Sequence, residues 1–170
     1  MPTRLPAHPS ALRVHRPMAL LLAAALVGCA SLQPPQAAIG QTEAEVLARL
    51  GTPTSRYTLP AGAQRLEYAT GPYGRTTLMV DLGGDGRVTA SAQVLTEANF
   101  AKVRDGMPRD EVLRLLGRPA DKAGEFMNRQ TWSWRYPTYD CLWARITFEP
   151  DGKTRGGASF LPDPRCDPDH

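Results

Sequence analysis

Gly40-Gln-Thr-Glu-Ala-Glu-Val-Leu-Ala-Arg-Leu-Gly-Thr-Pro53 returns 66 residues later as Gly106-Met-Pro-Arg-Asp-Glu-Val-Leu-Arg-Leu-Leu-Gly-Arg-Pro119. In both copies the apolar residues recur at helical spacing, which predicts a short amphipathic helix of about ten residues. Gly51 and Gly117 stand where a left-handed residue ends a helix, and Pro53 and Pro119 then prevent its continuation. The chain is therefore predicted to be organised around one helix that occurs twice.

The two copies of the helix differ at their start. In the first copy, Thr42 and Glu45 have the spacing of a capping box, in which each side chain accepts a hydrogen bond from the other residue's backbone N–H. In the second copy Pro108 replaces the threonine. Its fixed φ predicts that Pro108 serves as an early residue of the second helix.

The similarity continues without a gap as far as Leu95 and Leu161, so residues 39–95 and 96–161 are interpreted as two copies of one unit. Several apolar, aromatic and turn positions coincide in the two copies: Leu66 with Trp132, Tyr68 with Trp134, Val80 with Ile146, Leu82 with Phe148, and Asp85-Gly86 with Asp151-Gly152. Both units are therefore expected to have the same fold.

Period-two apolar patterns predict three strands in the first unit, at residues 65–70, 76–82 and 87–95, with an edge strand within residues 54–64. Glycine-rich turns separate them, which predicts an antiparallel meander. One face should pack on the helix, and it includes Val88, Ala90, Ala92 and Val94 of the last strand. The predicted class is α+β: two tandem units, each a short helix or helix pair packed on an antiparallel sheet of three to four strands.

The second unit is predicted to begin with an additional helix at residues 97–104, capped by Thr96. Its strands are predicted at residues 130–136, 142–149 and 154–161. Trp132, Trp134 and Tyr136 alternate onto one face. We interpret that stripe as core, because large aromatic side chains on a sheet face usually bury against a helix.

The N terminus is predicted to direct export. Residues 1–28 combine a basic stretch with an apolar run of about ten residues, which is typical of a signal peptide and too short to span a bilayer. Leu26-Val27-Gly28-Cys29 resembles a bacterial lipobox, which implies that Cys29 is lipidated. Residues 29–38 are then predicted to tether the protein to the periplasmic face of the outer membrane. The alternative is an ordinary secretory signal with an incidental Cys29.

Charge gives no indication of nucleic acid binding. The chain has 20 Lys plus Arg against 17 Asp plus Glu, and removal of Arg4, Arg13 and Arg16 with the signal peptide leaves 17 of each sign. The remaining basic residues are interspersed with acidic ones, without the basic face that nucleic acid requires.

The cysteines are consistent with an exported protein. If lipid modifies Cys29, Cys141 and Cys166 remain as a pair in an oxidising compartment, and we predict that they form a disulfide. That bond would attach the C-terminal tail, residues 162–170, to the start of a strand. The alternative is two free thiols.

No catalytic constellation, metal site or cofactor site is predicted. After removal of the signal peptide the chain keeps one histidine, His170, which excludes histidine-based triads and metal clusters in the folded part. Glu45 and Glu111 are explained by their places in the first turn of a helix. The protein is therefore expected not to be an enzyme.

The helix motif Gly-x-Thr-x-x-Glu-Val-x-x-x-x-Gly-x-Pro, followed by an aromatic strand and a meander, resembles the SmpA/OmlA domain of the BamE family of outer-membrane lipoproteins. In the second unit the match rests mainly on Glu111, Val112, Gly117, Pro119, Trp132 and Trp134, and Pro108 departs from it. The duplicated layout is also similar to the β-lactamase inhibitory protein. The resemblance implies a non-enzymatic protein-binding, assembly or scaffolding module of the cell envelope. The alternatives are a tandem-repeat inhibitor or ligand-binding protein of the periplasm and, less consistent with the sequence, an enzyme.

A surface for a protein partner is predicted on the second unit's sheet. If Ala144, Ile146 and Phe148 face inward, Trp143 and Arg145 lie on the opposite side, and Arg135 of the neighbouring strand joins them. Tryptophan beside arginine is typical of interface hot spots. The alternative is that the C-terminal tail or the first sheet covers Trp143.

Overall fold

The computed structural model describes residues 1, 3 and 36–166. Apart from residues 1 and 3, the predicted signal peptide lies outside the described part, as do Cys29 and His170. None of the helices in the described part is long and apolar enough to cross a membrane.

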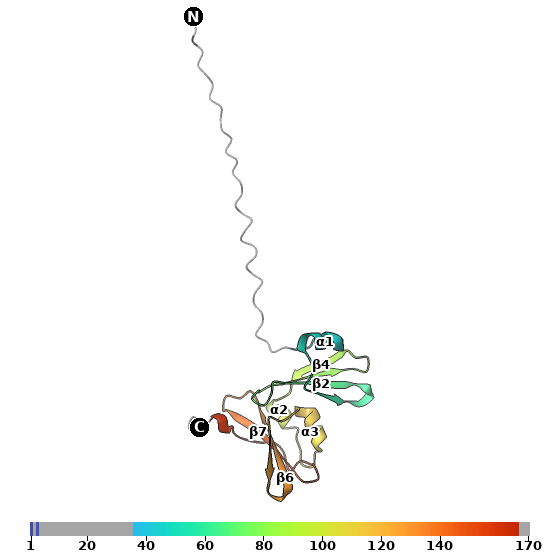
Figure 1. Ribbon diagram of the computed structural model, residues 1–170, viewed down its shortest axis with the longest axis vertical. Coiled ribbons are helices and arrows are strands. Elements are labelled where there is room, and N and C mark those ends of the chain that lie inside the picture. The colour runs from blue at the N-terminus through green and yellow to red at the C-terminus, as the bar shows by residue number, and fades with distance from the viewer. Residues whose placement is uncertain (2, 4–35, 167–170) are drawn as a thin grey trace. The chain divides into compact units, whose positions relative to one another are not determined.

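The first repeat is one helix followed by a four-stranded sheet (Figure 1). Helix α1 spans Glu43–Leu50, and the strands are β1 (Ser55–Thr58), β2 (Gln64–Ala69), β3 (Thr77–Leu82) and β4 (Val88–Gln93). A 3-10 turn, η1 (Pro60–Gly62), joins β1 to β2. Each strand pairs antiparallel with the next, so the order in the sheet is β1-β2-β3-β4. The meander expected from the sequence is therefore present.

The second repeat has two helices and a second four-stranded sheet. Its elements are α2 (Glu97–Phe100), α3 (Arg109–Leu116), β5 (Asp121–Glu125), η2 (Phe126–Asn128), β6 (Arg129–Arg135), β7 (Leu142–Phe148), β8 (Ser159–Pro162) and η3 (Pro164–Cys166). The sheet order is β5-β6-β7-β8, again antiparallel. The chain is thus an α+β protein of two tandem units.

Equivalent backbone contacts hold the helix start to the sheet in both repeats. The Gly40 N–H donates to the carbonyl of Val88 over 2.8 Å, and the Gly106 N–H donates to the carbonyl of Thr154 over 2.9 Å. Isolated bridges pair Thr42 with Arg87 and Pro108 with Lys153. The duplication therefore extends to the hydrogen bonds of the backbone.

The starts of the helices agree only partly with the sequence prediction. Thr42 forms the predicted capping box with Glu45. Pro108 was expected inside the second helix, but it is the N-cap, with an extended ψ of 145°. An extended N-cap satisfies the fixed φ of proline equally well, because the N-cap precedes the first residue with helical dihedrals.

Two strands differ from the prediction in extent or orientation. Strand β5 was not predicted, because Asp-Lys-Ala-Gly-Glu has no period-two apolar pattern. In β4, Val88 pairs with Leu82 but Ala90 pairs with Asp81, so one extra residue enters the strand as a bulge. After the bulge Ala90 and Ala92 are exposed on the face opposite α1, whereas they were expected to pack on the helix.

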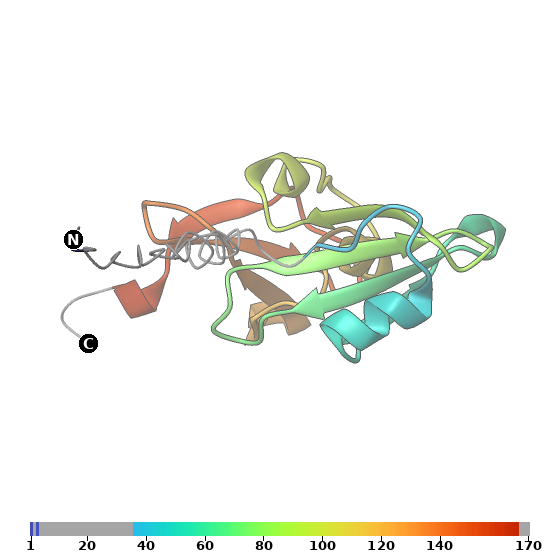
Figure 2. The ribbon, with the colours of Figure 1, turned by 90° about the horizontal axis from the view of Figure 1, so that it is seen from above.

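The described part of the chain has two apolar clusters, one of which is shared by the two repeats. One cluster contains Val46 of α1 with Ala37, Leu66, Val80, Leu82 and Val88. The other joins α3 to both sheets and contains Met79, Val94, Leu95, Phe100, Val112, Leu116, Trp132, Trp134, Tyr136, Ala144, Ile146 and Phe148, among others. Along the folded part, α1, the first sheet, α2 with α3, and the second sheet follow one another (Figure 1). The strands of the first sheet lie side by side in the view from above (Figure 2).

Polar groups on the first sheet hold the end of α3. Arg65 makes a bidentate ion pair with Asp81 and donates to the carbonyl of Arg114 over 2.6 Å. The fully buried carboxylate of Glu67 accepts from the Tyr57 hydroxyl over 2.5 Å and from the Arg118 N–H over 3.0 Å. Helix α3 of the second repeat is therefore held to the sheet of the first repeat as well as to the sheet of its own repeat.

The folded part begins earlier than residue 39. Ala37 is buried with the apolar side chains beneath α1, and its N–H donates to the Ser91 hydroxyl over 3.0 Å. The Ala38 N–H donates to Gln41 Oε1 over 2.8 Å. Residues 37 and 38 were expected to be tether, but they belong to the first repeat.

Candidate partner-binding face

The outer face of the second sheet is defined here as the Trp143 face. It consists of the residues of β6, β7 and β8 that share one side of the sheet: Thr131, Ser133, Arg135, Trp143, Arg145, Thr147, Ser159 and Leu161. Ala144, Ile146 and Phe148 alternate with the β7 members and are fully buried in the second cluster. Trp143 and Arg145 therefore lie on the side that the sequence predicted, and Trp132 and Trp134 are core.

Arg135 is not available as an exposed contact. Its Nε lies 2.5 Å from Asp163 Oδ2 and its Nη2 lies 3.1 Å from Asp163 Oδ1, while its Nη1 donates to the carbonyl of Pro72 over 2.9 Å. The residue is 8% exposed. The structure therefore places Arg135 in a buried ion pair, because the C-terminal segment supplies a carboxylate that satisfies the guanidinium, and a contact between Arg135 and a partner stays a prediction.

Trp143 is half-buried between two guanidinium groups. The Arg135 guanidinium carbon lies 5.1 Å from the centre of its ring and that of Arg145 lies 5.9 Å away. Each distance is within the range of a cation–π contact. Leu161 is directly opposite Trp143 in β8 and is 43% exposed. The indole is thus held in place and borders an exposed apolar side chain.

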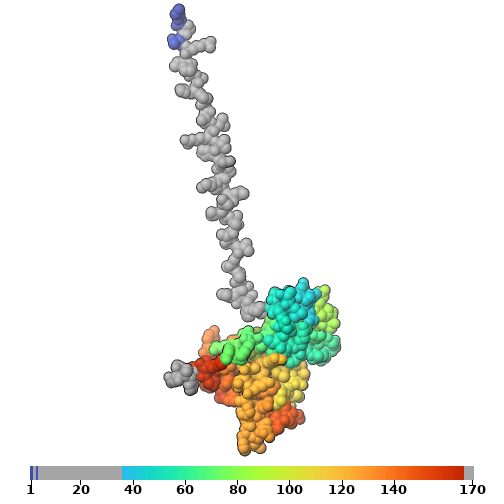
Figure 3. Space-filling model, in the orientation of Figure 1, coloured from blue at the N-terminus to red at the C-terminus, as the bar shows by residue number. Residues whose placement is uncertain are grey.

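The C-terminal segment is attached beside this face. Cys141 and Cys166 form the predicted disulfide, with a Cα–Cα distance of 6.1 Å, and the Asp163 N–H donates to the carbonyl of Cys141 over 2.8 Å. The Arg165 guanidinium lies 3.9 Å from the centre of the Tyr73 ring in the first repeat. Figure 3 shows this junction, where green atoms of the first repeat meet red atoms near the C terminus.

The Asp163 carboxylate stays ionised in this setting. Burial opposes its ionisation, but the hydrogen bonds from Arg135 and from the Arg165 N–H outweigh that effect and hold the pKa of Asp163 below its ordinary value. A buried pair of this kind leaves a costly unpaired charge if one partner is removed. The tail is therefore fixed by charge as well as by the disulfide.

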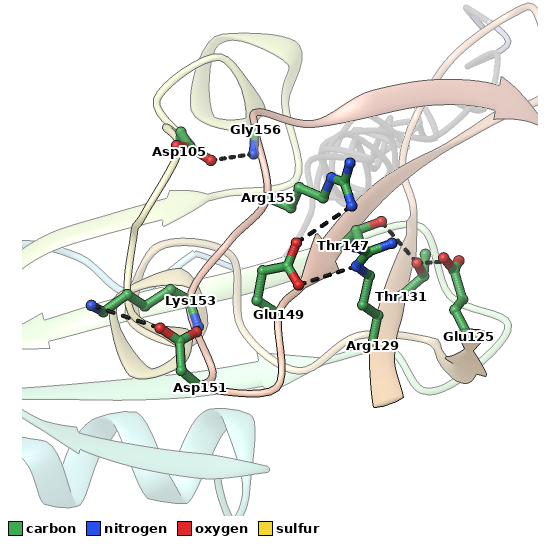
Figure 4. Close-up of polar contacts among 10 residues, drawn as sticks. All are labelled: Asp105, Glu125, Arg129, Thr131, Thr147, Glu149, Asp151, Lys153, Arg155 and Gly156. Carbon is green, nitrogen blue, oxygen red and sulfur yellow. Dashed lines mark hydrogen bonds and ion pairs between the residues drawn. The ribbon is translucent and has the colours of Figure 1, made fainter. Parts of the chain in front are cut away.

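A polar ladder continues the face toward η2 (Figure 4). The Thr131 hydroxyl bonds to Glu125 and lies 2.9 Å from the Thr147 hydroxyl. Glu149 bridges Arg129 over 3.1 Å and Arg155 over 3.5 Å. These neighbours explain why Thr131 is buried although it points away from the core.

Arg145 has an unused donor. Its Nη2 lies 3.5 Å from Glu125 Oε1, at the limit of a hydrogen bond, and its buried Nε has no hydrogen-bond partner among the described residues. An unsatisfied buried donor costs roughly 1–3 kcal/mol. The Arg145 side chain is 29% exposed, so a carboxylate of a partner could pair with its exposed nitrogens but not with the buried Nε.

Sequence reasoning missed the exposed residues around the face. Tyr73 and Tyr139 occupy equivalent positions in the two repeats and are 67% and 107% exposed. Exposed tyrosines in two equivalent turns could have been noticed from the alignment of the repeats. Leu161 could not, because its direction depends on the register between β7 and β8.

The remaining candidate sites in the described part have fewer features of a binding or catalytic site. No three His, Cys, Asp or Glu side chains within residues 36–166 converge on a potential metal site. A cleft of about 300 Å³ at the end of α1 is lined by Leu50, Tyr68 and Leu78 with several threonines. Glu45 accepts hydrogen bonds at the start of α1, which is the role predicted for it.

Comparison with known proteins adds little. No family model matches the chain, and no curated protein matches it. The chain is similar to the crystal structure of an extracellular protein containing an SCP domain from Bacillus anthracis strain Ames, at 12% identity and a TM-score of 0.29. The match covers 74% of this chain and 44% of the other, so this chain spans less than half of that protein's length. A TM-score of this size carries no argument about fold or function.

Proposed function

We propose that this protein is a non-enzymatic binding module of the bacterial cell envelope that engages a protein partner through the Trp143 face. The observation that carries the proposal is the half-buried Trp143, held between Arg135 and Arg145 on a sheet face whose side chains join neither apolar cluster. Tryptophan and arginine dominate interface hot spots because they combine large apolar area with polar groups.

The preorganisation of the face supports the same proposal. Arg135 is held by Asp163 and by Pro72, so the ring of Trp143 rests on a fixed guanidinium. A side chain that is ordered before binding loses less conformational entropy when the partner arrives. The exposed Leu161 extends the apolar contact beside it.

The location follows from the sequence. The lipobox at Cys29 and the resemblance to the BamE family favour a lipid anchor in the outer membrane, with the folded part in the periplasm. An acyl anchor attaches a protein to a membrane without a transmembrane helix. Labelling with a fatty acid analogue tests this part. Equal labelling of wild type and Cys29→Ala would refute it.

The test of the binding face is recovery of a partner from detergent-solubilised outer membrane. We expect Trp143→Ala and Arg145→Ala to lose the partner while the unfolding midpoint remains close to that of wild type. Phe126→Ala is the matched control, because Phe126 is 87% exposed on the far turn of the same sheet. This control should retain the partner.

Three outcomes decide between functions. Recovery of barrel-assembly subunits supports an assembly or scaffolding role, and recovery of one soluble protein supports a tandem-repeat inhibitor or ligand-binding protein. A loss of stability of about 3 kcal/mol or more for Trp143→Ala, with partner recovery unchanged, would show that the residue serves packing and would refute the binding face.

A further inference from the structure

Strand β1 is an edge strand of the first sheet. It pairs with β2 alone and has four residues. The Leu59 N–H donates to the carbonyl of Ala63 over 2.9 Å, in register with the pairing of Tyr57 and Arg65. Hydrogen-bonded and non-hydrogen-bonded pairs alternate in an antiparallel ladder. The N–H and C=O of Arg56 and Thr58 are therefore directed away from β2, toward the open edge.

Two grooves lie beside this edge, on the side that faces α3. One groove, of about 570 Å³, is lined by Leu59 at the end of β1 and by Met107, Arg114 and Leu115. The other, of about 480 Å³, is lined by Ser55, Arg56 and Tyr57 of β1 and by Leu113, Arg118, Pro119 and Lys122. One groove thus borders residues 55–57 of β1, and the other borders Leu59, the residue that follows the strand.

The grooves are cationic. Their lining includes Lys102, Arg104, Arg114, Arg118 and Lys122, and the one acidic lining side chain is Glu111. None of these five cations forms an ion pair with another residue of the described part. No carboxylate of the described part neutralises these charges, although Lys122 lies 4.2 Å from the centre of the Trp132 ring.

We propose that the open edge of β1 binds an extended acidic segment of a partner protein by strand addition. Main-chain hydrogen bonds from Arg56 and Thr58 would hold the added strand. Alternate side chains of that strand point to the same face of the sheet, so its acidic residues would enter the grooves beside Arg114 and Arg118. This site is separate from the Trp143 face, and its occupation does not depend on the function proposed there.

Charge excludes a second copy of this chain as the occupant. Pairing of β1 with β1 of another molecule would bring the cations beside each edge, among them Arg118 and Lys122, close to their counterparts. Like charges placed opposite one another across strands are destabilising. An acidic strand has the complementary charge and avoids this repulsion.

The test uses a fluorescein-labelled peptide, acetyl-TEVEVEVT-amide, and a basic counterpart, acetyl-TKVKVKVT-amide, at physiological salt. Fluorescence anisotropy should show binding of the acidic peptide and at least tenfold weaker binding of the basic one. The double variant Arg114→Ala/Arg118→Ala should bind the acidic peptide about tenfold more weakly. The control variant Arg49→Ala/Lys153→Ala removes two cations that line neither groove and should bind within about twofold of wild type.

Strand addition requires backbone hydrogen bonds from β1, whereas simple charge attraction does not, so changes to the backbone of β1 distinguish the two. Thr58→Pro removes an N–H directed toward the open edge, which an edge strand tolerates, and should weaken peptide binding about tenfold while the unfolding midpoint stays near that of wild type. Amide exchange at Arg56 and Thr58 should slow on binding. Equal binding of both peptides, unchanged binding by the double variant, absence of any binding, or unchanged amide exchange would each overturn the proposal.

Discussion

The helix that occurs twice ends at Gly51 in the first repeat and at Gly117 in the second, and the two glycines have nearly the same backbone conformation. Their φ angles are 78° and 76°. Around Gly51 nothing lies within 4 Å of the place that a Cβ would occupy, whereas at Gly117 a Cβ would lie 2.9 Å from Thr77 Cγ2 and 3.0 Å from Glu67 Cδ. The local sequence produces the same turn in both repeats, but the turn at Gly117 also packs against residues of the first repeat.

The difference follows from the order of the layers. Helix α1 contacts one sheet, while α3 shares an apolar cluster with residues of both sheets. The carbonyl of each glycine accepts a hydrogen bond from an aromatic side chain of its own repeat: Gly51 from the Tyr68 hydroxyl over 3.2 Å and Gly117 from the Trp134 indole over 3.1 Å. The C-terminal turn of α3 therefore also contacts the other repeat, through Thr77 and Glu67, whereas the turn of α1 contacts only its own sheet.

The largest expected effect that tests this comparison is at the two glycines. Gly51→Ala should cost about 1 kcal/mol of unfolding free energy, because a φ of 78° with a ψ of −162° is a backbone conformation that essentially only glycine adopts. Gly117→Ala should cost about 3 kcal/mol, because overpacking against Thr77 and Glu67 is added. Denaturant unfolding of both variants measures the difference. Equal losses would contradict the interface at Gly117.

A smaller effect is expected at positions 67 and 133, which are equivalent in the two repeats. Glu67→Ala should cost about 2 kcal/mol, because the Tyr57 hydroxyl and the Arg118 N–H lose their buried acceptor. Ser133→Ala, on the Trp143 face, should cost less than about 1 kcal/mol. Thermal unfolding is the measurement. A larger loss of stability for Ser133→Ala than for Glu67→Ala would contradict the expectation that position 67 is the more important contact.

The smallest of these effects is expected on the pH dependence of stability. The pKa of Glu45 is lowered by hydrogen bonds from Thr42, and that of Asp163 is lowered because bonds from Arg135 and the Arg165 N–H outweigh burial. Folded-state pKa values below the unfolded ones give stability that is present above about pH 4 and is lost as pH falls through the folded values. Asp163→Asn should reduce this pH dependence more than Glu45→Gln, because Asp163 is buried. Unfolding midpoints between about pH 2 and 7 test it, and an unchanged slope for Asp163→Asn would contradict it.

Features encoded by nearby residues could be predicted from the sequence. The glycines that end the helices, the capping box of Thr42 and the turns of the meander each depend on a few adjacent residues. The assignment of Trp134 to the core followed from its alternation with Ser133. The pairing of Cys141 with Cys166 was predicted because few cysteines were available.

Features decided by distant residues could not be predicted. Arg135 looked exposed because its partner, Asp163, is 28 residues away. The orientation of Ala90 depended on a bulge that does not interrupt the apolar pattern of β4. The edge strand itself was predicted within residues 54–64, but the cations beside it could not be, because they come from the second repeat.

The contact between Glu67 and Arg118 has a consequence for the order of folding. These residues are 51 positions apart, so a chain delivered N terminus first must wait for the second helix before the first sheet can be completed. Until then Met79 and the Glu67 carboxylate face water. Deletion of either repeat would expose the face that the other covers, and we therefore expect the two repeats to unfold together.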